Sequence, residues 1–304
     1  LNETLSSGSL LISNNAEPMP KIGLLSSYKF KQSQNFNFNF GISHGLFAKS
    51  AIYKTPPMLH EKFVYLNYSK NQNDFGIGFV HEAMWGGSTD EDGKFSTSYK
   101  DFLKIFISAD GPLLDGQSHA NALGNHLGIW DFYYKKTVNN KELKFYYQHF
   151  FEDTSGLRFD NKSDGLWGIE LSNYTKNTNI LLEYLNTMNQ DRNPPYVNEN
   201  YYNHFEYQEG WSYKGYSLGN PFINHTNNNP SKVLHLGVNR NGINKYSYRL
   251  LASRRINLSD HIKYQISIGK MINELLIGVV FTGEKNMNNN VTLKISYSPI
   301  MKAR

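Results

Sequence analysis

Cysteine is absent from the 304-residue sequence, and no apolar run approaches the ~20 residues that a membrane-spanning helix requires. The first absence excludes disulfides, thiolate metal sites and a cysteine nucleophile. The second excludes a helical membrane protein but not a β-barrel, whose apolar residues occupy every second position. No signal peptide is recognisable and the chain begins with Leu1, so we expect a fragment of a longer protein.

Charge is scattered along the chain and nearly balanced. Lys and Arg total 31 against 26 Asp and Glu, which gives a formal charge of +5 without a basic cluster. We therefore expect no nucleic-acid partner. Aromatic residues are plentiful at 14%, mostly Tyr and Phe, and they favour strands over helices.

Several segments alternate strictly between apolar and polar or small residues. In 34–45, Phe36, Phe38 and Phe40 alternate with asparagines, and 74–80 and 290–298 follow the same rule. Period-two spacing predicts strands whose two faces have different surroundings. A fully aromatic face opposite an amide face indicates lipid outside and a wet lumen inside. The alternative is the half-buried strand of a soluble β-sandwich.

About 13 strands are expected, or 14 if the segment 9–13 is a strand. They cover 21–30, 34–45, 59–69, 75–83, 124–136, 142–152, 165–174, 178–188, 232–239, 245–256, 262–270, 274–282 and 290–298. Short and long connectors alternate, as expected where short turns lie at one end of an outer-membrane barrel and long extracellular loops at the other. The pattern predicts an all-β, antiparallel transmembrane β-barrel. A large soluble β-sheet protein is the alternative. In one long connector, Phe102, Leu103, Phe106 and Ile107 are spaced for one face of a short helix, with a strand as the alternative.

If the apolar registers face lipid, the intervening charged residues point inward. These are Glu82, Asp131, Lys144, Glu152, Glu170, Glu183, Arg249, Lys263 and Lys294. We expect most of these carboxylates and bases to satisfy one another, as in other barrel interiors. A transport channel is the alternative that this mixed-charge lumen leaves open.

Four clusters gather on the rim formed by the long loops, at 81–87, 124–132, 151–168 and 209–222. Each mixes Gly with Trp or Tyr and with acidic, amide or His side chains. Aromatic faces and planar polar groups are what a carbohydrate site needs, although concave sites of this kind suit other ligands too. For Trp130 and Trp167 we favour an aromatic girdle at the membrane interface. Trp85 and Trp211 fit either role.

Catalytic patterns are weak. Glu152 and Asp153 are adjacent, so on a strand their side chains diverge and cannot flank one glycosidic bond. The pair His81-Glu82 is not followed by the second histidine of a zinc helix. No nucleophile elbow or phosphate loop is present, and the acidic stretch 90–92 is a weak calcium signal. We expect no enzyme, cofactor or metal; an outer-membrane hydrolase is the weakest alternative.

Five motifs occur in order: GSLLISNNAEPMPKI, FGIGFVHEAMWGG, GNHLGIWDF, SGLRFDNKSDGLWGIEL and GWSYKGYSLGNPF. Together they resemble the Wzi capsule-assembly family, in its Bacteroidetes-type form. The resemblance implies an outer-membrane barrel of about 18 strands that acts as a lectin and helps attach capsular polysaccharide to the cell surface. It also implies that residues 1–304 are a single domain lacking N-terminal strands.

The motif positions carried over are candidate polysaccharide-binding residues. They are His81, Glu82, Trp85, Asn125, His126, Asp131, Asp153, Arg158, Asp164, Trp211, Tyr213 and Asn220. The expected partners are capsular or another surface polysaccharide, such as O-antigen or exopolysaccharide, and outer-membrane lipid. We expect a monomer in the outer membrane of a Gram-negative bacterium.

Overall fold

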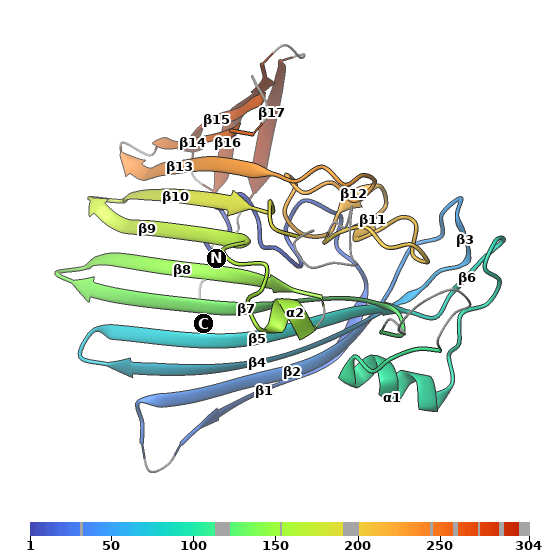
Figure 1. The fold of residues 1–304 in the computed structure, drawn as a ribbon. Helices are drawn as coiled ribbons and strands as arrows, with labels where there is room; N and C mark the ends of the chain where they lie inside the picture. The colour runs from blue at the N-terminus through green and yellow to red at the C-terminus, as the bar shows by residue number, and fades with distance from the viewer. Residues whose placement is uncertain are drawn as a thin grey trace.

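The structure, a computed structural model, describes residues 1–30, 33–112, 122–152, 154–190, 201–243, 246–257, 261–272, 274–285 and 289–297. Within these ranges, 13 strands form one antiparallel sheet in which each strand pairs with its neighbours in the sequence (Figure 1). They are β1 (Lys21–Lys29), β2 (Phe36–Leu46), β4 (Met58–Lys70), β5 (Asn73–Trp85), β7 (Asn125–Val138), β8 (Lys141–Phe151), β9 (Gly165–Thr175), β10 (Thr178–Asn186), β13 (Lys232–Ile243), β14 (Tyr246–Arg255), β15 (His261–Ile272), β16 (Leu275–Glu284) and β17 (Asn290–Tyr297). The all-β prediction and the count of 13 are confirmed.

Smaller elements lie in the long connectors. They are β3 (Tyr53–Thr55), β6 (Ser88–Thr89), β11 (Ser212–Tyr213), β12 (Tyr216–Ser217), α1 (Tyr99–Ile107) and α2 (Thr154–Leu157). Figure 1 shows α1, α2 and these short strands near one end of the sheet, which we call the long-loop rim. Neither helix is long and apolar enough to cross a membrane.

Tight turns join the strands at the opposite end. Between β7 and β8, Asn139 and Asn140 have φ of 48° and 63°. Two successive positive φ values are what a two-residue hairpin turn requires, because its twist then matches that of the strands. The element bounds confirm the predicted alternation of short turns and long loops from β2 to β13.

Strand register separates two faces of the sheet. Leu66 pairs with Ile77 and Val64 with Phe79 on one face, whereas Tyr65 pairs with Gly78 on the other. Apolar side chains on the outward face remain exposed, for example Ile77 at 41% and Ile169 at 42%. A sheet face of exposed apolar side chains is what lipid contact requires. The predicted inward charges on strands lie on the opposite face, and Glu152 lies beyond the end of β8.

The segment 9–13 is not a strand, so the predicted fourteenth strand is wrong. Residues 1–20 instead run along the inward face, where their backbone is bonded to side chains of the sheet. The backbone N–H of Leu10 donates to Oε1 of Gln148 at 3.2 Å, and that of Ser7 donates to Oε2 of Glu183 at 2.6 Å. The side chains of Gln148 and Glu183 thus accept the backbone hydrogen bonds that a neighbouring strand would otherwise accept.

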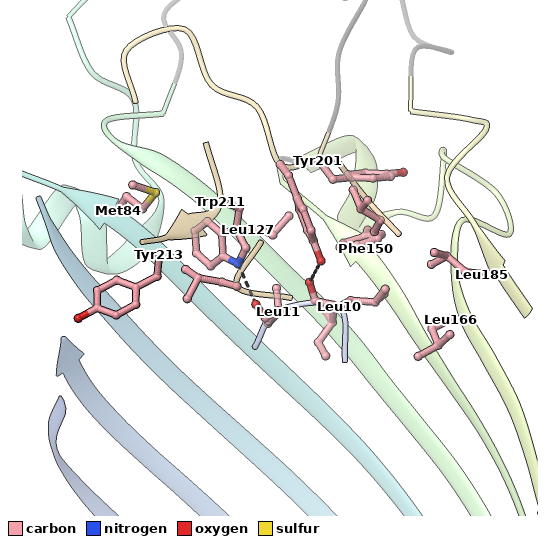
Figure 2. Packing of buried hydrophobic residues seen from close by; sticks show 14 of the residues in the cluster. Leu10, Leu11, Met84, Leu127, Phe150, Leu166, Leu185, Tyr201, Trp211 and Tyr213 are labelled. Atoms are coloured by element: carbon pink, nitrogen blue, oxygen red, sulfur yellow. Dashed lines mark hydrogen bonds between the residues drawn. The ribbon is translucent and has the colours of Figure 1, made fainter. Parts of the chain in front are cut away.

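The inward face is dry where this segment covers it. Leu5, Leu10 and Leu11 are almost fully buried and join a core that also includes Leu127, Ile129, Phe150, Leu166, Leu181, Tyr202 and Trp211. Figure 2 shows Trp211 bonded to Leu11, where the indole N–H donates to the backbone oxygen at 2.8 Å. Burial of each leucine side chain contributes about 1.5–3 kcal/mol. The predicted wet lumen is therefore wrong for this part of the sheet.

We had expected the inward carboxylates to pair with inward bases. Under the N-terminal segment, Glu170 and Glu183 have other partners. Glu183 accepts hydrogen bonds from the hydroxyls of Ser6 and Tyr146, and Glu170 accepts one from the Asn2 amide. The N-terminal segment was not foreseen as their partner, because its contacts span more than 160 residues of sequence.

Candidate functional site

The predicted binding residues divide between the two faces of the sheet. His81 and Glu82 are consecutive on β5, so they point to opposite sides. Their side chains are therefore not placed to act as a pair. His81 lies on the outward face under α1. Glu82 is buried on the inward face, where its Oε2 atom has no hydrogen-bond partner among the described residues.

Most of the other candidates are buried as well. The indole of Trp211 and the side chains of Asn125, Tyr213 and Asn220 are at most 5% exposed. The Asn220 amide donates to the Gly8 backbone oxygen at 2.8 Å, so it ties the loop to the N-terminal segment. Asp131 accepts hydrogen bonds from Tyr65 at 3.0 Å and from Gln148 at 3.3 Å. In this structure these side chains position the loops and strands around the rim.

Asp164 is fully buried at the start of β9 and holds two loops together. Its carboxylate accepts hydrogen bonds from the Asn189 backbone N–H at 2.8 Å, the Asn186 amide at 3.0 Å and the Tyr201 hydroxyl at 2.9 Å. Burial raises the pKa of this carboxyl, while the donated hydrogen bonds oppose the shift.

Three candidates retain accessible surface: Arg158, Trp85 and the half-buried Asp131. Arg158 extends into solvent and pairs with Asp160 at 3.4 Å, its side chain 65% exposed. The ring of Trp85 lies 5.2 Å from that of Phe102 and is half-buried. Asp153 lies outside the described residues. The role of all twelve residues in polysaccharide binding stays a prediction.

His81 also belongs to a basic cluster on the outward face. Its Nδ1 atom lies 2.8 Å from Nζ of Lys62, and its Nε2 atom lies 2.9 Å from Nδ1 of His126 and 2.8 Å from Oγ of Ser108. The Lys62 ammonium can only donate, so Nδ1 of His81 accepts and Nε2 carries the proton. The imidazole therefore cannot take a proton from Ser108. Among the described residues, no group of acidic, His or Cys side chains is arranged to hold a metal ion.

A pocket of about 780 Å³ lies on the inward face, beyond the part that the N-terminal segment covers. Its lining includes Ser6, Ser7, Pro221 and Phe222 on one side and, on the other, inward residues near the rim ends of β13–β17: His235, Leu251, Ser253, Lys263, Gln265, Thr282, Glu284 and Asn290. We call it the rim pocket. Its size lies within the ~300–1,000 Å³ typical of ligand sites.

Polar groups in the rim pocket have defined orientations. His235 places its Nε2 atom 2.7 Å from the Leu5 backbone oxygen and its Nδ1 atom 2.7 Å from the Ser253 hydroxyl. Because a carbonyl can only accept, Nε2 carries the proton and Nδ1 accepts from the serine. Lys263 and Glu284 form an ion pair at 3.4 Å, and the lysine side chain is 54% exposed. Gln265 accepts from Arg249 at 2.7 Å, which orients its amide.

Ser253 and His235 are as close as a nucleophile and its base. They lack the free backbone N–H groups that would form an oxyanion hole. Ser253 lies within β14 and pairs with His235 of β13 on one side and with Lys263 of β15 on the other. Backbone N–H groups engaged in two strand ladders are not free to stabilise an oxyanion, which acyl transfer requires.

Sequence reasoning identified Lys263 as inward but missed the rest of the rim pocket. Its residues come from five strands, the N-terminal segment and the loop before β13, and most of the strand residues are ordinary polar positions on their own strands. The available signal was the inward register near strand ends after β13. Ser253, Lys263 and Glu284 follow one another at one level, and Gln265, Thr282 and Asn290 at the next.

Comparisons with known proteins agree with the fold. A solved structure of Wzi, an outer membrane protein of Escherichia coli described as a carbohydrate-binding β-barrel involved in group 1 capsule assembly, matches with a TM-score of 0.60 and 19% identity. The match covers 94% of this chain and 62% of that one, so the chain spans less than two thirds of that relative's length. A mutant porin of Rh. blastica matches at a TM-score of 0.40, with 7% identity over 90% of this chain and 88% of the porin. No curated protein sequence matches.

The sheet, its exposed apolar face and the likeness to the Wzi structure define the class by fold: an antiparallel sheet of the outer-membrane β-barrel type. The model of the capsule assembly protein Wzi family matches residues 5–296. The chain belongs to this family, and the resemblance drawn from its motifs is confirmed. The expected count of about 18 strands stays a prediction.

Proposed function

We propose that this chain binds a surface polysaccharide and helps to attach capsule to the cell surface. Support comes from the family and from the E. coli relative, which is described as a carbohydrate-binding barrel in capsule assembly. The observation that carries the proposal is the rim pocket, an inward-facing site with several polar side chains at the end of the sheet where the long loops gather.

The chemistry of the rim pocket suits a sugar. Hydroxyl, amide and carboxylate groups converge from β13–β17, and sugar hydroxyls both donate and accept hydrogen bonds. Phe222 contributes an aromatic wall on the side of the N-terminal segment. Lys263 supplies a positive charge that can bind an acidic sugar. The sugar would then replace part of the exposed ion pair between Lys263 and Glu284.

The core on the inward face favours this function over transport. A channel needs a continuous aqueous path, whereas Leu10, Leu11 and Trp211 occupy the inward side of β7–β9 near the rim. We propose that Trp85 and Arg158 provide outer contacts on the same rim. The buried candidates Asp164, Trp211, Tyr213 and Asn220 hold the loops that shape it.

Titration of capsular polysaccharide from the source strain into the purified protein tests the proposal. The double variant Lys263→Ala/Gln265→Ala removes one charged and one amide contact, so we expect affinity to fall by about tenfold or more. Lys270→Ala is the matched control, because Lys270 is on the same strand but at its opposite end, over the Tyr246 ring. Equal affinity of the double variant and the control would contradict this assignment of the pocket.

The same three proteins can be compared in cells by capsule retention. We expect the control strain to keep its capsule and the double variant to release it into the medium. No shortening of the polysaccharide and no new reducing ends are expected on incubation with the protein, because the chain is proposed to bind and not to cleave.

A further inference from the structure

We propose that α1 is an interfacial helix that lies in the outer leaflet beside the barrel wall and contacts lipid through Tyr99, Leu103 and Ile107. The structure places α1 beside the ends of β4 and β5 in Figure 1, on the outward side of the sheet. This position of α1 is independent of polysaccharide binding.

One side of α1 packs against the sheet. The Phe102 ring lies 5.5 Å from His60 and 5.2 Å from Trp85, and the Phe106 ring lies 5.4 Å from His60 and 4.6 Å from Nζ of Lys62. His60, Lys62 and Trp85 all have outward register. The helix therefore covers the outer wall of the sheet, not its lumen.

A second side of α1 is apolar and uncovered. Tyr99, Leu103 and Ile107 are 77%, 45% and 71% exposed. They are spaced at i, i+4 and i+8, so they form one continuous stripe along the helix. Exposed apolar stripes of this kind are unfavourable in water and mark a surface that another phase or molecule covers.

The direction of this stripe follows from the contacts around the helix. Successive residues rotate by about 100°, which gives the order Ile105, Phe102, Phe106, Tyr99, Leu103, Ile107, Lys100, Lys104. Ile105 approaches Gly124, beyond the rim end of β7. Phe106 lies over Lys62, farther from the rim than the Trp85 ring that Phe102 contacts. Tyr99, Leu103 and Ile107 follow Phe106 in this order, so they lie still farther from the rim. The stripe therefore faces the membrane.

The stripe is continuous with the lipid-facing surface. Lys62 is followed in the outward register by Val64 and Leu66, and Val64 pairs with Phe79. Two residues of strand advance by about 6.6 Å, less than the ~10 Å diameter of a helix with its side chains. The side of α1 that is farther from the rim therefore reaches the level of Val64, where the outward face of the sheet becomes apolar.

The remaining side and the ends of α1 are polar, as an interfacial helix requires. Lys100 and Lys104 follow the stripe around the helix, and Nζ of Lys104 donates to the Asp110 backbone oxygen at 3.0 Å. The Ser98 hydroxyl caps the first turn by accepting from the Asp101 N–H at 3.1 Å, and Ser108 closes the last turn in a left-handed conformation. A short amphipathic helix with capped ends lies in the interface plane, with its apolar side about 5–10 Å deep.

Fluorescence quenching by brominated lipids tests this placement. The chain has no cysteine, so Leu103→Cys and Ile107→Cys each carry one environment-sensitive probe in the full chain, reconstituted in phosphatidylcholine vesicles. Lys100→Cys is the control on the polar side of α1, and Ile77→Cys is the lipid-facing reference on β5. We expect the probes at 103 and 107 to be quenched as strongly as the probe at 77, and the probe at 100 much less.

Quenching at 103 and 107 as weak as at 100 would overturn the proposal. Blue-shifted emission at 103 and 107 without quenching would also overturn it, because protein and not lipid would then cover the stripe. The two positions are measured separately, so loss of folding in one variant leaves the other as the test.

Discussion

The inward face of the sheet has two halves that differ in what covers them. Under β8–β10 the N-terminal segment and its leucines fill the space, and Glu183 is bonded to Ser6, Ser7 and Tyr146. Under β14–β17 the same strand register leaves the rim pocket open, and Lys263 meets Glu284 at 3.4 Å with more than half of its side chain exposed. Polar residues in identical strand positions therefore hold the fold in one half and remain accessible in the other.

Trp211→Ala should destabilise the protein most, through the half of the inward face that the N-terminal segment fills. The indole is fully buried and donates to Leu11, so its removal leaves a cavity and an unsatisfied carbonyl. We expect a loss of about 3–5 kcal/mol in the free energy of unfolding, measured by thermal or denaturant unfolding in detergent. Tyr216→Ala, in the same loop at 57% exposure, is the control. Unchanged stability with lost polysaccharide binding would instead make Trp211 a ligand contact.

Glu183→Ala should have the second-largest effect. It removes the acceptor for three donors, two of them from the N-terminal segment. Hydrogen bonds to a charged group contribute about 1.5–3 kcal/mol each, although these are not additive. We expect faster proteolysis within residues 1–20 while the sheet remains folded. Glu17→Ala is the control, since Glu17 lies in the same segment but pairs with Lys214 at the surface. Equal cleavage of the two variants would contradict the anchoring role.

Asp164 should make stability depend on pH. Burial raises the pKa of this carboxyl in the folded state, so the folded state holds its proton to higher pH than the unfolded chain does. Its contribution is full below the unfolded pKa and is lost as pH rises through the folded pKa. We expect melting temperature to fall less from acidic to neutral pH in Asp164→Asn than in the wild type. A parallel pH profile of the two proteins would contradict this.

Arg158→Ala should have the smallest effect. The side chain is exposed, and its ion pair with Asp160 contributes at most about 1 kcal/mol. We expect no measurable change in unfolding and a modest loss of polysaccharide affinity by titration. A loss as large as that of Lys263→Ala/Gln265→Ala would move the main site from the rim pocket to the outer loops.

Local patterns predicted the sheet well. The alternation at 74–80 and 34–45 specified which side chains face outward, because a strand side chain has two environments. Short connectors marked one end of the sheet. The spacing of Phe102, Leu103, Phe106 and Ile107 predicted α1, but the structure divides these four between the sheet and the exposed stripe.

Long-range contacts could not be predicted in the same way. Nothing in residues 1–20 indicates that Leu5 and Leu10 insert beside strands more than 100 residues away. The conspicuous Trp211 and Asn220 became buried because this segment lies against them. The rim pocket was missed because most of its strand residues are common polar residues that meet only when five strands are assembled.

Cysteine labelling of two glutamines compares the two halves most directly. Gln148 is buried under the N-terminal segment, whereas Gln265 lines the rim pocket. With a hydrophilic maleimide, we expect Gln265→Cys to react quickly and to be protected by added capsular polysaccharide. Gln148→Cys should react slowly, with or without polysaccharide. Reaction at position 265 that stays unchanged when polysaccharide is bound would contradict the assignment of the rim pocket as the binding site.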